Sequence, residues 1–213
     1  IVGTLYSEMG DELWKALGIP IKENTYSDIL QSHNLWIDPS GYAFIEHQAG
    51  DNIHIANLNS SPSSPIYEGT FGNLAANCHD IYTRNNIAYV SEGWSYEFGI
   101  YDISNLNNII QLATIPCNGY AHNAWLNDED THLITTEETS SEIIISVLDA
   151  GPGVPKNQLD EITKAFVRIG EKKQGGFGLG LSICRKVMVA HGGRLTIKNN
   201  AIKGSCFSLH FPK

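Results

Sequence analysis

The first two thirds of this 213-residue chain contain very few basic residues. Up to residue 142 only Lys15, Lys22 and Arg84 stand against 19 acidic residues, whereas residues 143–213 carry 11 basic and four acidic residues. Nucleic acids and anionic membranes are bound largely through Lys and Arg, so the first part is not expected to bind either. The change of charge sign predicts two parts of different origin. The basic second part suits a polyphosphate ligand, although a basic surface is commonly just a solvated face.

Other features are also missing. No apolar run approaches the roughly 18 residues that a membrane helix needs, so no membrane span is predicted. The four cysteines show no CxxC spacing, which favours free or buried thiols over a disulfide or metal role. The chain begins with Ile1 rather than Met, and no basic segment precedes an apolar one. We therefore predict no signal peptide and expect a fragment or a processed product.

A four-residue pattern occurs three times: a histidine, then Asn or Asp, then any residue, then Trp or Tyr. It begins at His33, His79 and His122, at intervals of 46 and 43 residues. Short β-branched and aromatic runs follow, separated by Asn, Gly, Ser and Pro turns. These runs lie at residues 42–45, 87–90 and 131–134, and again at 53–58 and 99–104. A period near 45 residues with three or four strands in each unit is typical of propeller blades.

The segments SHNLWID, CHDIYTRNNIAYVSEG, IYDIS and AHNAWL resemble the bacterial LVIVD-repeat propellers, often described as choice-of-anchor B proteins. The resemblance covers about residues 25–138, or some two and a half blades. It implies an interaction module with a protein partner, at the cell surface or secreted. Because a closed propeller usually has four to eight blades, the array is expected to be incomplete, with exposed strand edges that favour aggregation.

The three repeated histidines allow two interpretations. His33, His79 and His122 occupy equivalent positions, and imidazole groups around a common axis suit zinc or another transition metal. Alternatively, each histidine bonds to the backbone of a neighbouring blade, and the Asn or Asp that follows it closes a turn. We favour the structural interpretation and predict no metal site.

The second part predicts a sheet covered on one face by helices. We expect strands over residues 143–148, 194–198 and 205–211. Helices are expected over 158–166 and 181–190, the second of which ends at a glycine cap in His191-Gly192-Gly193. Residues 143–147 read equally well as the next strand of the third repeat.

Two glycine-rich segments flank the shorter predicted helix: Asp149-Ala-Gly-Pro-Gly and, from Gly175, GGFGLGLS. Glycine permits positive φ and close approach of backbone N–H groups to an anion. A helix that begins just after Gly180 also presents its N-terminal dipole to phosphate. The candidate nucleotide-binding residues are Asp149, Gly151, Gly153, Phe166, Gly176, Gly178, Leu179, Gly180 and Leu181.

With the Phe166-Val167-Arg168 element between them, these segments resemble the G1, F and G2 boxes of the ATP-binding domain of sensor histidine kinases. The resemblance implies that ATP is the cofactor and that Asp149 accepts a hydrogen bond from the adenine amino group. It also implies that the glycines of the second segment hold the phosphates. The stretch from Phe166 to Gln174 would form a lid in which Lys172 and Lys173 face phosphate, although a solvated position is equally open for these two.

Two family features are missing from the sequence. No helix with an HExxxN-like pattern, which supplies the Asn ligand of Mg²⁺ in the family, precedes Asp149, and no phosphoacceptor helix is present. Phosphoryl transfer depends on positioning and on charge neutralisation by the metal, so kinase activity from these residues alone is expected to be incomplete. The resemblance implies a cytoplasmic location, which conflicts with the surface location implied by the repeats, and the location stays open.

The fold expected is therefore mixed: an all-β partial propeller of about 2.5 blades, followed by an α/β sandwich fragment of the histidine-kinase ATPase type. We assign residues 25–140 to the repeats and 141–213 to the C-terminal half of an ATP-binding domain, and leave 1–24 unassigned. The leading hypothesis for function is a nucleotide-binding segment of a two-component signalling protein. A propeller interaction module and a chimeric or truncated product without native activity are the alternatives.

Overall fold

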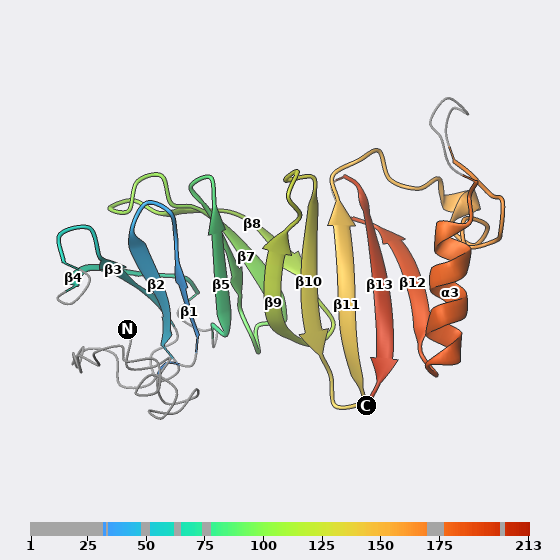
Figure 1. The fold of residues 1–213 in the computed structure, drawn as a ribbon, viewed down its shortest axis with the longest axis horizontal. Helices are drawn as coiled ribbons and strands as arrows, with labels where there is room; N and C mark the ends of the chain where they lie inside the picture. The colour runs from blue at the N-terminus through green and yellow to red at the C-terminus, as the bar shows by residue number, and fades with distance from the viewer. Residues whose placement is uncertain are drawn as a thin grey trace, which may run out of the picture. The chain divides into compact units, whose positions relative to one another are not determined.

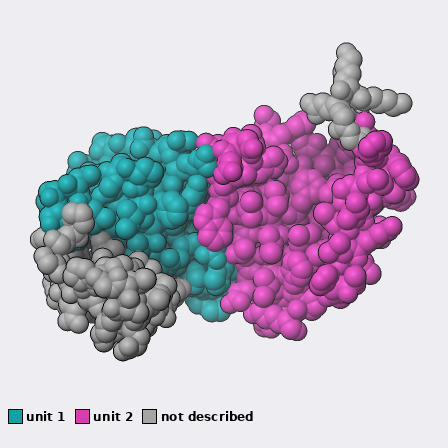
Figure 2. Space-filling view, in the orientation of Figure 1, with its two compact units in different colours: residues 1–123 teal, residues 124–213 magenta. Residues whose placement is uncertain are grey.

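The computed structural model of the chain forms two compact units, residues 1–123 and 124–213 (Figure 2). The structure describes residues 32, 34–47, 52–61, 65–73, 78–169, 177–200 and 203–213. Within these ranges the chain folds into three sheets and one α-helix, with a short 3-10 turn between them (Figure 1). Residues 1–24 and His33 lie outside the described residues.

The first two sheets of unit 1 repeat one another. Sheet one has the order β1-β2-β3-β4 and sheet two β5-β6-β7-β8, so that each is a meander of neighbouring strands. Their bounds are Leu35–Ile37, Tyr42–His47, Asn52–Asn57 and Ile66–Phe71, then Asp80–Arg84, Ile87–Ser91, Glu97–Asp102 and Ile110–Pro116. Both sheets carry a register shift between the third and fourth strands, at Ile55/Ala56 and at Ile100/Tyr101. The strands expected from the repeat pattern are confirmed.

The core of unit 1 joins these two sheets through one apolar cluster. Phe44, Ile53 and Ile55 of the first sheet belong to the same buried cluster as Ile81 and Val90 of the second. Alternate residues of a strand point to opposite faces, and β2 and β3 are buried on both faces, because Ala43, Ile45 and Ala56 form a second buried cluster. Burial of this apolar surface is what the runs contribute to the fold.

The polar residues of the repeated motif connect successive repeats. The buried carboxylate of Asp80 accepts hydrogen bonds from the side-chain amides of Asn34 and, at 2.7 Å, of Asn123. These two bonds reach the preceding and the following repeat, so they link repeats, and the expectation that Asp80 closes a turn stays a prediction. His79 Nδ1 lies 2.9 Å from the backbone oxygen of His122, which is the backbone contact expected for a structural histidine.

The third sheet has the strand order β12-β13-β11-β10-β9. Its strands are β9 (Tyr120–Leu126), β10 (His132–Glu138), β11 (Glu142–Asp149), β12 (Arg194–Asn199) and β13 (Ser205–Pro212). Strand β11 pairs antiparallel with β10 on one side and with β13 on the other. Both readings of residues 143–147 therefore hold at once: this strand continues the third repeat and also belongs to the C-terminal sheet.

The helix expected over 181–190 is α3 (Gly180–Ala190), and it packs against β12 and β13. Gly192, at φ +70°, ends it as the predicted glycine cap. The helix expected over 158–166 is wrong. A 3-10 turn, η1 (Lys156–Gln158), is followed by separate turns that include Lys164 N–H to Glu161 O at 2.9 Å. A nine-residue segment with β-branched residues gains too little from helical hydrogen bonds to offset nucleation.

The three sheets are open in the described part of the chain, so the propeller architecture of residues 25–140 stays a prediction. The domain division at residue 140 also stays a prediction. All four cysteines are free thiols, of which Cys78 and Cys206 are buried. Among the described residues, no helix is long and apolar enough to span a membrane.

Candidate functional site

The topology of unit 2 brings the two glycine segments to the same end of its sheet. Strand β11 ends at Asp149, and β13, which is antiparallel to it, begins beside that end, with Leu148 opposite Cys206. Strand β12 is antiparallel to β13 and ends there too, with Asn199 opposite Ser205. Helix α3 precedes β12 through a tight turn at the far end, so its N-terminus lies at the Asp149 end (Figure 1).

The first glycine segment is shaped by its own carboxylate. Asp149 Oδ1 accepts the backbone N–H of Gly151 at 2.7 Å, and a Cβ at Gly151 would lie 2.8 Å from that same oxygen. Gly153 adopts φ +81°, a region that favours glycine. Oδ1 of Asp149 is therefore engaged within its own loop.

Residues from the turn between β12 and β13 fix this segment in place. The Asn199 side chain accepts the N–H of Val154 and donates to its carbonyl, both at 2.7 Å. Asn200 donates to the backbone oxygen of Asp149 at 3.0 Å. Gly204, at φ +87°, lets the turn approach that strand end, because a Cβ there would overlap the Asp149 carbonyl. No sequence pattern pointed to these supporting residues, which lie about 50 residues from the loop they hold.

The second glycine segment lies against the Phe166 element. The Phe166 N–H donates to the carbonyl oxygen of Gly178 at 2.9 Å, and both residues adopt positive φ, +68° and +67°. A Cβ at Gly178 would lie 2.6 Å from the carbonyl oxygen of Val167. The structure thus brings together two of the three predicted segments through a direct backbone contact. Phe166 itself is 74% exposed.

Helix α3 starts without a capping side chain. Leu179 is its N-cap, Gly180 and Leu181 are its first residues, and the first turn contains no acidic residue. The N–H groups of a first helical turn have no partner within the helix, so this end suits an anion. Of the predicted site residues only Gly176 lies outside the described residues, together with Lys172 and Lys173 of the expected lid.

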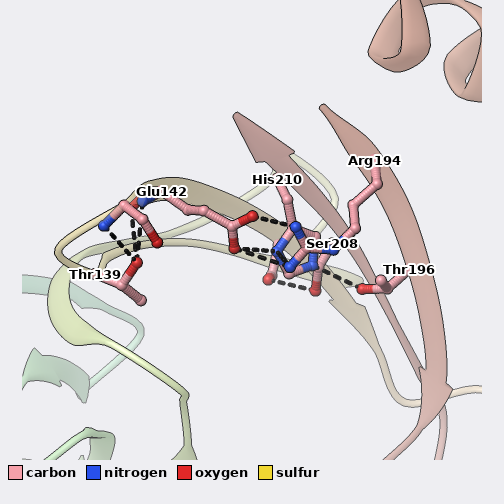
Figure 3. A network of polar contacts seen from close by, with 8 residues as sticks. Thr139, Glu142, Arg194, Thr196, Ser208 and His210 are labelled. Atoms are coloured by element: carbon pink, nitrogen blue, oxygen red, sulfur yellow. Dashed lines mark hydrogen bonds and ion pairs between the residues drawn. The ribbon is translucent and has the colours of Figure 1, made fainter. Parts of the chain in front are cut away.

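A polar network on the same sheet is a second candidate for chemistry (Figure 3). His210 is buried and lies between Glu142, whose Oε2 is 3.3 Å from Nδ1, and Thr196, whose hydroxyl is 2.8 Å from Nε2. Arg194 forms a bidentate ion pair with Glu142 and also places a nitrogen 3.0 Å from His210 Nδ1. A hydroxyl, a histidine and a carboxylate in this order have the layout of a nucleophile with its base.

The contact between Arg194 and His210 argues against that chemistry. A guanidinium group only donates, so Nδ1 of a neutral His210 accepts from Arg194 and the proton resides on Nε2. A protonated His210 would donate from Nδ1 to Glu142 and still carry a proton on Nε2. In both states Nε2 donates to Thr196 and cannot accept its proton. The network therefore stabilises the pairing of β11, β13 and β12.

This network predicts an acid limb in the stability of unit 2. Hydrogen bonds from Arg194 lower the pKa of Glu142 from 4.5 to about 2. A carboxylate with a depressed pKa stabilises the fold above its unfolded pKa, and this contribution is lost as the pH falls from 4.5 to about 2. We expect Glu142→Gln to flatten the fall of the thermal midpoint over this range, measured by circular dichroism. Glu138→Gln, which removes an exposed ion pair with Lys213, is the control and should leave the limb intact. An unchanged limb in Glu142→Gln would contradict the assignment.

Comparison with known proteins identifies the C-terminal part. Residues 112–213 match the family described as "Histidine kinase-, DNA gyrase B-, and HSP90-like ATPase". The adaptive-response sensory kinase SasA of Synechococcus sp. (strain CC9311) is 37% identical over 82 residues, 38% of this chain and 21% of that protein. Sporulation kinase C of Bacillus subtilis (strain 168) is 43% identical over 79 residues, 37% of this chain and 18% of that protein. Full-length ShkA, solved in complex with AMPPNP, is 30% identical with a TM-score of 0.33, covering 38% of this chain and 17% of that one.

Residues 112–213 are thus a domain of this ATPase family. The domain is histidine kinase-like and homologous to a part of SasA and of other sensor kinases. The chain spans about a fifth of the length of these curated relatives.

The repeated histidines do not assemble a metal centre in the described part of the chain, where no group of three or more His, Cys, Asp or Glu residues has suitable geometry. The rings of His79 and His122 lie close together in a tilted arrangement, with centroids 4.1 Å apart at 48°. His122 Nδ1 lies 2.6 Å from the side-chain oxygen of Asn123. His33 lies outside the described residues, so metal binding by all three stays untested.

Proposed function

We propose that unit 2 binds an adenine nucleotide with the base at Asp149 and the phosphates at the second glycine segment. The observation that carries this is the common position of the end of β11 and the start of α3, which puts a carboxylate and a helix N-terminus at one end of the sheet. ATP requires a hydrogen-bond acceptor for its adenine amino group and N–H donors for its phosphates. Both the ATPase family and the residues at the Asp149 end of the sheet support ATP as the ligand.

The adenine end of the site uses one carboxylate oxygen for shape and one for recognition. Gly151 holds Oδ1 of Asp149, which orients Oδ2 for an exocyclic amino group. Gly151 and Gly153 leave room for the flat base because neither carries a side chain. At the phosphate end, Gly178 to Leu181 offer backbone N–H groups and the positive end of the helix dipole. The stretch containing Lys172 and Lys173 would add charge neutralisation.

We further propose that these residues bind nucleotide without completing phosphoryl transfer. The sequence between the repeats and Asp149 contains β10 and β11 rather than a helix bearing an Asn ligand for Mg²⁺. Phosphoryl transfer depends on a metal ion that bridges the phosphates. Nucleotide affinity is therefore expected to depend only weakly on Mg²⁺.

Isothermal titration calorimetry of the full chain with ATP tests both statements. We expect saturable binding that is weakened at least about tenfold by Asp149→Ala, since a buried hydrogen bond to a charged group contributes roughly 1.5–3 kcal/mol. Asp160→Ala is the matched control: its exposed carboxylate lies in the following turns and should leave affinity unchanged. A folded chain that takes up no ATP would refute the nucleotide site. A large gain of ATP affinity with Mg²⁺ would refute the statement that the metal site is missing, and would leave the nucleotide site supported.

The interaction-module alternative concerns unit 1. Two four-stranded sheets with the same order and the same bulge position support a blade-like repeat over residues 25–140. A protein partner for this surface stays a prediction. A partner that binds equally well to the Asp149→Ala variant would assign it to the repeats.

A further inference from the structure

Unit 1 buries a carboxyl group one of whose oxygens has no hydrogen-bond partner. Glu92 directly follows strand β6, and its side chain is fully buried. In the described part of the chain its Oε2 has no hydrogen-bond partner, whereas its Oε1 accepts a hydrogen bond from the hydroxyl of Tyr101, a core residue on β7. Removing a carboxylate from water costs far more than removing a neutral acid unless the charge is paired and fully hydrogen-bonded. The site therefore penalises the charged form of Glu92.

The hydrogen of the Tyr101 hydroxyl is directed at Glu92. Gln111 Nε2 lies 3.1 Å from that hydroxyl oxygen, and an amide NH₂ group only donates. The hydroxyl consequently accepts from Gln111 and donates to Oε1 of Glu92. Burial raises the pKa of Tyr101, so this donor keeps its hydrogen. A proton on Glu92 itself therefore resides on Oε2.

The groups around Glu92 favour its neutral form. Burial is the largest influence and raises the pKa of Glu92 above 4.5. The hydrogen bonds from Tyr101 and Asn73 act in the opposite direction, whereas the carboxylate of Glu97 raises the pKa further. The buried thiol of Cys78 is the remaining titratable group here, and it acts on Tyr101. None of these four neighbours carries a positive charge that could compensate an ionised Glu92.

The repeat does not require this buried pair. Tyr101 directly follows the register shift between β7 and β8, and the residue in the same place of sheet one is Ala56. Ala56 is fully buried, so sheet one fills this place without a hydroxyl group. In sheet two Gly99 makes room for the pair, because a Cβ there would overlap both the Glu92 oxygen and the Tyr101 ring. The pair is thus an addition to the architecture that the two sheets share.

We propose that the folded chain holds Glu92 as a neutral carboxylic acid, so that unit 1 loses stability as the pH rises above the acidic range. The unfolded chain releases this proton near the ordinary pKa of 4.5. A group whose pKa is raised by folding stabilises the fold fully below its unfolded pKa, and this contribution is lost as the pH rises through the folded pKa. The direction is opposite to that expected for Glu142 in unit 2. The device is independent of the proposed nucleotide site.

Glu92→Gln tests the proposal, because glutamine has the shape of the neutral acid and cannot ionise. Urea unfolding of the full chain, followed by tryptophan fluorescence, should give similar stabilities for variant and wild type at pH 4. Above pH 4.5 the folding equilibrium constant of the variant should gain on that of the wild type by up to about tenfold per pH unit. A variant that loses stability relative to the wild type as the pH rises would overturn the proposal, as would a difference that does not depend on pH.

Glu68→Gln is the matched control. It neutralises an exposed carboxylate on β4 that accepts from Asn57, and its pH profile should follow that of the wild type. An equal pH-dependent gain in this control would overturn the assignment to Glu92.

Infrared spectroscopy tests the protonation state directly, even if Glu92→Gln does not fold. At pH 6, where ordinary carboxyl groups are ionised, the folded wild type should show the carbonyl stretch of a protonated carboxylic acid. Tyr101→Phe removes the hydrogen bond to the carbonyl oxygen Oε1 and should move this band to higher frequency. A wild type without the band, or a band that Tyr101→Phe leaves in place, would contradict a neutral Glu92.

Discussion

Replacing Gly204 by alanine should abolish nucleotide binding and destabilise unit 2 by about 3 kcal/mol or more, in the range of severe backbone strain and overpacking. The glycine adopts φ +87°, and a Cβ there would overlap the carbonyl oxygen of Asp149 and lie 2.6 Å from its carbonyl carbon. Both clashing atoms are backbone, so no side-chain rotation relieves them. The end of β11 must move away, and it carries the carboxylate proposed to bind adenine.

Gly192→Ala is the matched control for this experiment. Gly192 also adopts positive φ, +70°, but a Cβ there would meet only a Pro212 ring carbon at an ordinary 3.8 Å. This variant bears only the conformational cost of a left-handed backbone, about 1–2 kcal/mol, without the clash. Urea unfolding and ATP titration should therefore separate the two. Similar losses in both variants would show that positive φ, and not the approach of the turn to Asp149, sets the requirement for glycine.

Much of this fold could be predicted from the sequence because its signals are local. The strands β2, β3, β6 and β7 are short runs of mainly apolar, largely buried residues, and turns separate them. The fourth strands, β4 and β8, gave no signal. All residues of β4 except Phe71 are exposed or half-buried, and β8 reads Ile-Gln-Leu-Ala-Thr-Ile-Pro without a buried residue. An edge strand can form from backbone pairing alone, which leaves no hydrophobic pattern to recognise.

The candidate site shows the same division between local and distant signals. The positions of Asp149 and Gly180, at a strand end and a helix start, followed from local pattern. The clasp by Asn199 and the approach of Gly204 depend on the register of β12 against β13. Strand register is decided by the whole sheet, so neither Asn199 nor Gly204 could be identified from the local sequence. The short helix expected over 158–166 did not form because a nine-residue segment with β-branched residues gains too little from helical hydrogen bonds to offset nucleation.

The second large effect is expected at Asp80, where Asp80→Ala should destabilise unit 1 by about 3 kcal/mol, since two hydrogen bonds to a buried charge are lost. The carboxylate is 5% exposed and accepts from the side-chain amides of Asn34 and Asn123. Alanine leaves both amide donors without this acceptor. Asp102→Ala, which removes an acceptor for the Ser104 N–H at an exposed turn, should cause a clearly smaller loss in urea unfolding followed by tryptophan fluorescence.

A charge swap between equivalent positions of the repeat tests the cause of that loss. In Asp80→Asn the new amide accepts from one neighbour, but its own NH₂ group faces the NH₂ group of the other, so stability should fall. Adding Asn123→Asp restores an acceptor opposite that NH₂, while Asn34 still donates to residue 80. The double variant should regain most of the stability that the single change removes. If it regains none, the three repeats are held together by their apolar strands alone, and the motif's polar residues do not link one repeat to the next.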